Sequence, residues 1–202
     1  MEQFAGYPQE ETIKKLAAMI VYLASKTNGE FRGRTKLTKH LLFADIAAFK
    51  KYERSISGDL YVREQAGPIP SHFYEALDYA RDTGFLMEDS DQVEVSGLGS
   101  RLRYRLTVSS LGAEQANACL SDGEKSIIDA VFAEFSDMTT TELVDKAHSL
   151  PAWNYSEPGE PLSIPELSIE SEEEYWEFVE LVEDLEDNDT SAMEALNDLL
   201  KD

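Results

Sequence analysis

The sequence predicts a mainly helical fold with a small β-hairpin, an α+β protein. Apolar residues recur at helical spacing in three segments of the first half of the chain, at residues 8–28, 35–52 and 71–83. Strand-like alternation follows at 93–95 and 102–108, on either side of a glycine-rich turn. Three helices followed by a two-stranded hairpin is the element order of a winged helix. We therefore expect a winged-helix-like helical core, followed by acidic C-terminal helices.

Local signals place the ends of these elements. Pro8 fixes the first turn of the first helix, and the Asn-Gly pair at 28–29 ends it. Thr35 is the expected N-cap of the second helix, and Gly84 closes the third. Between the second and third helices, residues 60–62 are expected to form a short strand.

Capping boxes mark three helices in the second half of the chain. A Ser or Thr is followed three residues later by Glu at 121–124, 139–142 and 171–174. The prolines within residues 150–168 predict an extended connector, and a last short helix is expected from about Thr190. These boundaries divide the chain into a domain over residues 1–156 and an acidic helical extension over residues 157–202.

The negative charge of the chain is concentrated in its second part. Residues 1–110 carry 15 basic and 15 acidic side chains, whereas residues 111–202 carry 3 basic and 25 acidic ones. Within residues 157–202 there are 17 acidic residues and a single base, Lys201. Such a field repels nucleic-acid phosphates and attracts basic partners over a screening length of about 8 Å. The alternative is a solvated surface that only keeps the protein soluble.

Enzyme signatures are missing from the sequence, and we expect a non-enzymatic protein without a cofactor or metal. There is no phosphate loop, no Gly-x-Ser-x-Gly elbow and no His-Glu-x-x-His helix. His72 and Glu75 lie one helical turn apart, which fits a surface pair better than a metal site. Cys119, the single cysteine, is expected to be a small packed side chain. Neither a signal peptide nor a membrane span is expected, which indicates a cytoplasmic protein with no membrane partner.

The winged-helix order raises DNA binding as an alternative function. The third helix, which would enter the major groove, carries three acidic residues between 71 and 83. A helix in the groove needs Lys or Arg near the phosphates, so this one disfavours nucleic acid as a partner. On the hairpin, Arg101, Arg103 and Arg105 share one strand face. They either reach a groove or an acidic protein, or they form a solvated strand face.

An ordered series of motifs runs along residues 10–155. It comprises Lys36-Leu37-Thr38-Lys39-His40-Leu41-Leu42-Phe43-Ala44-Asp45, Arg54-Ser55-Ile56-Ser57-Gly58-Asp59-Leu60-Tyr61, Gly67-Pro68-Ile69-Pro70, Tyr74, Thr141-Glu142-Leu143, His148 and Trp153. This series resembles the Panacea domain, also called the SocA-like antitoxin domain. The resemblance does not extend to residues 160–202.

The resemblance implies an antitoxin of a bacterial or prophage toxin–antitoxin system, which neutralises a cognate protein toxin by direct binding. Members of this family bind chemically diverse toxins, and at least one delivers its toxin to a protease. The resemblance names neither the toxin nor any catalytic residue. We expect the toxin to be encoded by the adjacent gene, and the oligomeric state is left open. The alternatives are a winged-helix transcriptional regulator, an acidic nucleic-acid mimic and a proteolytic adaptor.

Toxin contacts are expected on three parts of the chain, the motif region, the hairpin and the predicted helix that begins near residue 171. Tyr and Arg are favoured interface anchors, and an amphipathic helix can lie in a groove of its partner while its carboxylates meet a basic surface. The expected contact residues are Tyr61, Arg63, Tyr74, Arg101, Arg103, Arg105, Tyr175, Phe178 and Val182. The alternative for the last three is that their apolar stripe packs on its own domain.

Other motif residues are expected to be structural. Gly58 and Gly67 should permit turns, and Asp45 and Asp59 should act as caps or internal pairs.

Overall fold

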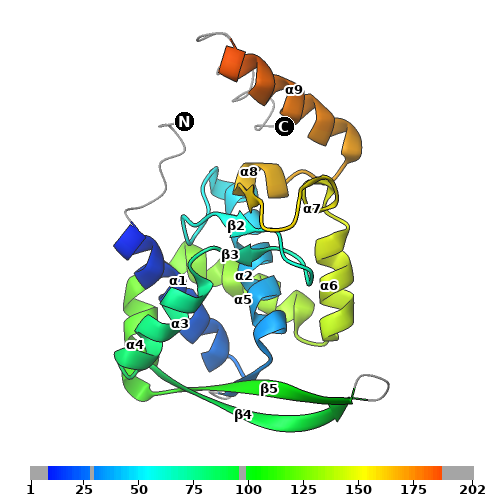
Figure 1. The fold of residues 1–202 in the computed structure, drawn as a ribbon. Coiled ribbons are helices and arrows are strands. Elements are labelled where there is room, and N and C mark those ends of the chain that lie inside the picture. The colour runs from blue at the N-terminus through cyan, green and yellow to red at the C-terminus, as the bar shows by residue number, and fades with distance from the viewer. Residues whose placement is uncertain (1–8, 28–29, 96–98, 188–202) are drawn as a thin grey trace.

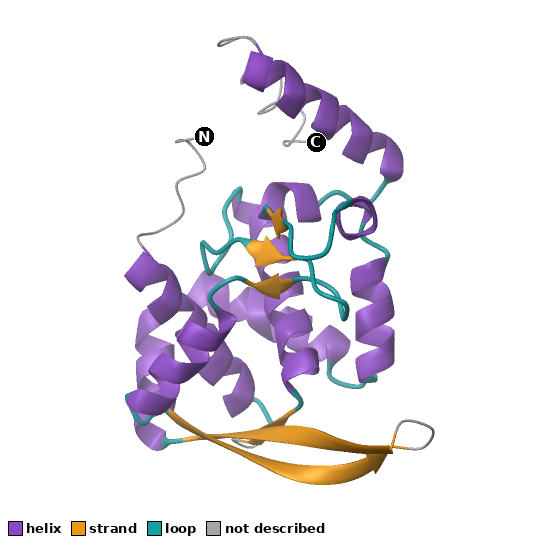
Figure 2. Cartoon of the chain, in the orientation of Figure 1, coloured by secondary structure: helices purple, strands orange, loops and turns teal. Residues whose placement is uncertain are grey.

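A computed structural model describes residues 9–27, 30–95 and 99–187 (Figures 1 and 2). Its helices are α1 (Gln9–Ser25), α2 (Arg34–Tyr52), α3 (Phe73–Asp82), α4 (Ser110–Cys119), α5 (Asp122–Phe135), α6 (Thr140–His148), α7 (Pro151–Tyr155), α8 (Ile164–Leu167) and α9 (Glu172–Asp187). Its strands are β1 (Glu30–Arg32), β2 (Tyr61–Val62), β3 (Ile69–Pro70), β4 (Leu86–Val95), β5 (Gly99–Val108) and β6 (Pro161–Leu162). The prediction of a mainly helical fold with a small amount of antiparallel sheet is confirmed.

The strands form two small antiparallel sheets, ordered β1-β5-β4 and β3-β2-β6. The predicted hairpin is present but longer than expected, because β4 already begins at Leu86. Strand β1 was not predicted, since three residues are too few to show alternation; it pairs along β5 from Glu30 opposite Thr107. The hairpin lies across one end of the molecule, and α9 lies at the other end (Figure 1).

Helix α2 links the two hydrophobic clusters of the core. Leu37 and Leu41 belong to the cluster built around α1, whereas Leu42 belongs to the one built with α5, α6 and α8. All ten residues from 37 to 46 are buried. A helix buried on every side must also bury its polar residues, and those of α2 need partners inside the protein.

The ends of the helices follow the predicted signals in most places. The capping boxes at Ser121 and Thr139 are formed, each with both reciprocal hydrogen bonds. The prediction of Thr35 as the N-cap of α2 is wrong, because the helix already begins at Arg34. The residue before it, Gly33, has a φ of +92°, which turns the chain from β1 into α2 without a side-chain cap.

The expected extended connector over residues 150–168 is wrong. Pro151 and Pro165 stand in the first turns of α7 and α8, where a missing N–H costs nothing, so these prolines begin helices. Strand β6 lies between the two helices and pairs with β2. A further capping box, Ser163 with Glu166, opens α8. Helix α4 was also not predicted, and the short helix expected from Thr190 lies outside the described residues.

The segment after residue 156 packs into the same core as the segment before it. Leu162, Ile164, Leu167 and Phe178 belong to the cluster that contains Leu42. The division at residue 156 stays a prediction, but it does not coincide with a break in packing. Among the described helices, none combines the length and the apolar character that crossing a membrane requires.

Candidate functional site

The loop between β2 and β3, residues 63–68, is bordered by aromatic and basic side chains, of which Tyr74 is exposed and the others are half-buried. Gly67 in this loop has a φ of +88°, and a Cβ added there would lie 3.0 Å from Ala147 Cβ and 3.0 Å from Lys39 Nζ. The loop backbone therefore lies directly against α2 and α6, as only glycine permits. We call the five side chains around this loop the loop face: Arg34, Arg63, Tyr74, His148 and Trp153.

Lys39 holds the loop in place through a buried hydrogen bond. It lies in α2 with a fully buried side chain, and its Nζ donates to the carbonyl oxygen of Pro68 at 2.6 Å. Burial lowers the pKa of Lys39 from 10.5 to about 7. The role of this lysine was not predicted from the sequence, because lysine side chains are rarely fully buried.

One half of the loop face is a stack of three side chains. The rings of His148 and Trp153 are parallel, with centroids 3.7 Å apart, and the guanidinium carbon of Arg63 lies 4.4 Å from the Trp153 centroid. Trp153 Nε1 donates to the carbonyl oxygen of Glu64 at 3.0 Å, and His148 Nε2 lies 3.1 Å from that of Gln65. The stack thus holds the loop from the side of α6 and α7.

The other half is centred on Arg34. Its guanidinium donates to both carboxylate oxygens of Glu88, at 2.7 and 2.6 Å, and its Cζ lies 3.7 Å from the Tyr104 ring centroid and 5.7 Å from that of Tyr74. Tyr74 is 54% exposed. A small hollow of about 90 Å³ completes this half; it lies between Arg34, Tyr74, Ala66 of the loop and Ile69 of β3.

The expected contact residues of the motif region separate into two groups. Arg63 and Tyr74 border the same loop; Tyr74 is exposed and Arg63 is half-buried. Tyr61 is different: its side chain is 0% exposed, and its hydroxyl donates to Asp45 at 2.9 Å. As placed here Tyr61 cannot touch a partner, because it is a structural residue of the core.

Asp45 is the acceptor at the centre of that buried network. Its Oδ1 accepts from the backbone nitrogens of Ile56 and Ser57, and its Oδ2 accepts from the hydroxyls of Ser57 and Tyr61. Burial raises the pKa of Asp45 to about 6, against the hydrogen bonds that favour its charged form. Asp59 likewise holds the start of α3 through Ser71 and His72. Asp59 thus acts at a helix start and Asp45 in an internal hydrogen-bonded network, in line with the expectation of caps or internal pairs.

The arginines of the hairpin are engaged within the hairpin itself. Arg103 and Arg105 lie directly opposite Asp91 and Asp89 on β4, and each guanidinium donates to both oxygens of its carboxylate. Arg101 lies opposite Val93 nearer the tip and is exposed. This arrangement matches the solvated strand face, since an arginine with a carboxylate of its own offers less charge to a phosphate.

The apolar stripe of α9 faces inward. Tyr175 and Phe178 are 6% and 8% exposed and belong to the core cluster of α2 and α8, and Val182 packs against that cluster. The hydroxyl of Tyr175 donates to Glu166 at 3.4 Å, and burial raises its pKa to about 12. The expected insertion of these three residues into a toxin groove does not fit this arrangement, because the stripe is already covered by its own domain.

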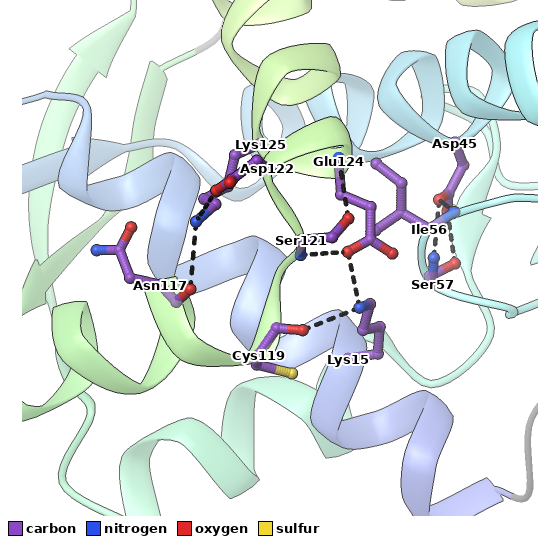
Figure 3. Close-up of polar contacts among 10 residues, drawn as sticks. All are labelled: Lys15, Asp45, Ile56, Ser57, Asn117, Cys119, Ser121, Asp122, Glu124 and Lys125. Carbon is purple, nitrogen blue, oxygen red and sulfur yellow. Dashed lines mark hydrogen bonds and ion pairs between the residues drawn. The ribbon is translucent and has the colours of Figure 1, made fainter.

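A hollow of about 390 Å³ lies between α2, the 54–56 segment and the start of α5. Figure 3 shows its polar neighbours: Glu124 accepts from Lys15 at 2.9 Å and from the backbone nitrogen of Ser121 at 2.7 Å. Burial alone would raise the pKa of Glu124, but these two partners hold it below its ordinary value. Its carboxylate is therefore committed to the helix cap and an ion pair, and it is poorly suited to acid–base work.

The sequence also led to expectations for two single residues, Cys119 and His72. Cys119 is exposed at the end of α4, so the expected packed position is wrong. His72 pairs with Asp59 through Nδ1 at 2.8 Å. Within the described residues, no three His, Cys, Asp or Glu side chains are placed to hold a metal ion.

Comparison with known proteins places the chain. Searches of curated proteins and of solved structures found no match to it. A scan against protein families matches residues 37–154 to the family described as "Antitoxin SocA-like, Panacea domain". The matched range begins in α2, contains the whole loop face except Arg34, and ends in α7. It covers more than half of the sequence, and the chain therefore belongs to the SocA-like Panacea antitoxin family.

Proposed function

We propose that this chain is a non-catalytic antitoxin that neutralises a cognate protein toxin by binding it directly, and that the loop face is where it binds. Membership of the Panacea family carries the function. The loop face supports the location, because it combines the exposed Tyr74 with half-buried aromatic and arginine side chains, the residue types that anchor protein interfaces. The partner is the product of the adjacent gene, and both proteins act in the cytoplasm.

The rigidity of the loop face favours binding. Arg34, Arg63 and Trp153 are each held by a ring contact and at least one hydrogen bond, so little side-chain freedom is left to lose on association. Lys39 and Gly67 fix the loop beneath them. A preorganised surface of this kind suits inhibition by occlusion, in which the antitoxin covers the working surface of the toxin.

A winged-helix-like core within residues 1–156 is part of the proposal, and the acidic segment 157–202 is its extension. The sheet order β1-β5-β4, with α1, α2 and α3 preceding the hairpin, supports this core. DNA binding is not part of the proposal, because α3 exposes Glu75 and Asp78 and two of the hairpin arginines, Arg103 and Arg105, have carboxylate partners.

Co-expression with the neighbouring gene tests the function. Induction of that gene alone should arrest growth of a bacterial host, and co-expression of this chain should restore it. Arg63→Glu and Tyr74→Ala should abolish or weaken the rescue. Tyr52→Ala is the matched control, since Tyr52 is 41% exposed but lines the hollow at α5, away from the loop. A neighbour that is harmless, or toxic and not rescued, contradicts the antitoxin function. Equal rescue by all three folded variants contradicts the loop face.

A further inference from the structure

Two aromatic rings remain exposed at the end of the molecule that carries α9. Tyr155, at the end of α7, is 44% exposed, and Trp176, in α9, is 47% exposed. Their centroids lie 4.8 Å apart at 56°, and the buried ring of Tyr175 lies beneath them at 5.6 and 5.4 Å. The two exposed rings thus lie side by side against a buried third ring. Single exposed apolar residues are ordinary, whereas a contiguous exposed group of this kind marks an interaction site.

Carboxylates surround these rings. Glu172, Glu173 and Glu180 stand four residues before, three before and four after Trp176, so they share its face of α9, and all three are exposed. The hydroxyl of Tyr155 is hydrogen-bonded to Glu172, which raises the pKa of Tyr155. We call Tyr155, Trp176 and these three glutamates the aromatic–acidic face.

Helix α9 has no positive charge to balance these carboxylates. Residues 147–187 contain no Lys or Arg, and the described part of the chain shows no ion pair to any acid of α9. The last turn of α9 also carries acidic residues and no base, next to the negative end of the helix dipole. Like charges three and four residues apart destabilise a helix. A cation bound at the aromatic–acidic face would relieve the repulsion among its carboxylates.

From this arrangement we propose that the aromatic–acidic face binds an arginine- or lysine-rich segment of a partner protein. The two rings offer their faces for cation–π contact, and the glutamates supply the compensating charge. A guanidinium is the better fit, because its flat, weakly hydrated cation stacks on aromatic rings and pairs with carboxylates together. This surface lies outside the family-matched range and is separate from the loop face, so it does not depend on the toxin being the partner.

Titration of the full chain with a short fluorescein-labelled arginine-rich peptide tests this proposal by fluorescence anisotropy. Because the chain carries a net charge of −22, general attraction must be separated from binding at the face. The Tyr155→Ala/Trp176→Ala variant leaves the charge unchanged and should bind about tenfold more weakly, as expected for the loss of two cation–π contacts. Tyr52→Ala, which removes an exposed ring elsewhere, should bind like the wild type.

A second pair of variants tests the carboxylates at equal net charge. Glu172→Gln/Glu173→Gln/Glu180→Gln should weaken binding by at least as much as the double ring variant. Glu75→Gln/Glu114→Gln/Asp137→Asn, which neutralises exposed acids elsewhere, should have a much smaller effect.

Three outcomes would overturn the proposal. The first is wild-type affinity for the peptide in the double ring variant. The second is an equal loss of peptide affinity in the two triple variants that neutralise carboxylates. The third is concentration-dependent self-association that the ring variant abolishes, without any binding of the peptide, which would assign the face to a second copy of the chain.

Discussion

The hydroxyl of Tyr61 donates to the carboxylate of Asp45 at 2.9 Å, and both side chains are completely buried. This contact joins β2 to the middle of α2, and with Ser57 and Ile56 it determines how the chain returns from α2 toward the loop face. Asp45 and Tyr61, both within the family-matched range, thus serve the fold, and they position the loop that follows.

Removal of the Asp45 carboxylate should be far more costly than removal of the Tyr61 hydroxyl. Asp45→Ala leaves four donors without their acceptor and should lower the free energy of unfolding by about 3 kcal/mol or more, whereas Tyr61→Phe removes one of the four hydrogen bonds and should cost about 1 kcal/mol. Urea unfolding followed by circular dichroism measures both. Folded Tyr61→Phe should still neutralise the toxin; its failure to do so would make the hydroxyl part of the interface.

Lys39 should make stability depend on pH in the neutral to alkaline range. Its pKa is lowered by burial from 10.5 to about 7, so between these values the unfolded chain holds a proton that the folded chain has released. The free energy of unfolding should therefore rise with pH from about 7 to about 10.5, by at most about 1.4 kcal/mol per pH unit.

Lys39→Met removes this titration while filling nearly the same space. The difference in unfolding free energy between wild type and Lys39→Met should change with pH in the interval above, as measured by urea unfolding at a series of pH values. A constant difference across it would mean that Lys39 keeps its proton in the folded state.

The elements predicted from sequence were those with a strong local signal. The capping boxes at Ser121 and Thr139 act within one turn of helix and are formed as expected. The elements that were missed depend on distant partners: β1 exists because β5 lies beside it, and β6 because β2 does. Local patterns carry no information about such pairings.

The residues of the candidate site could likewise be predicted from the sequence only in part. Arg63 and Tyr74 were predicted as toxin contacts from their residue type. The same criterion also predicted Tyr61, because a sequence motif does not reveal which side of a strand faces the core. Lys39 was missed because α2 is buried on all sides, and its charge suggested an exposed position.

Two arginines with similar bidentate partners should differ in their effect on stability. Glu88, the partner of Arg34, has a side chain that is 4% exposed, whereas Asp91, the partner of Arg103, is 54% exposed. Arg34→Ala should therefore leave a buried carboxylate short of its main partner and cost about 2 kcal/mol, with Arg81 as the remaining contact. Arg103→Ala should have little effect, because water replaces the lost partner. Thermal unfolding of the two variants side by side measures the difference, and equal losses would mean that burial of Glu88 does not matter.

Helix α9 should contribute to stability through one face only. Phe178 is 8% exposed within the core cluster, whereas Trp176, two residues earlier, is 47% exposed. Phe178→Ala should lower the free energy of unfolding by about 3 kcal/mol, and Trp176→Ala should leave it nearly unchanged.

For the same reason a chain that ends at residue 156 should lose thermal stability, because it lacks Leu162, Ile164 and Leu167 as well as α9. Circular dichroism melting of the three proteins checks this. If the shortened chain melts like the wild type but neutralises the toxin less well, and with a smaller salt dependence, the acidic extension acts on the toxin rather than on its own domain.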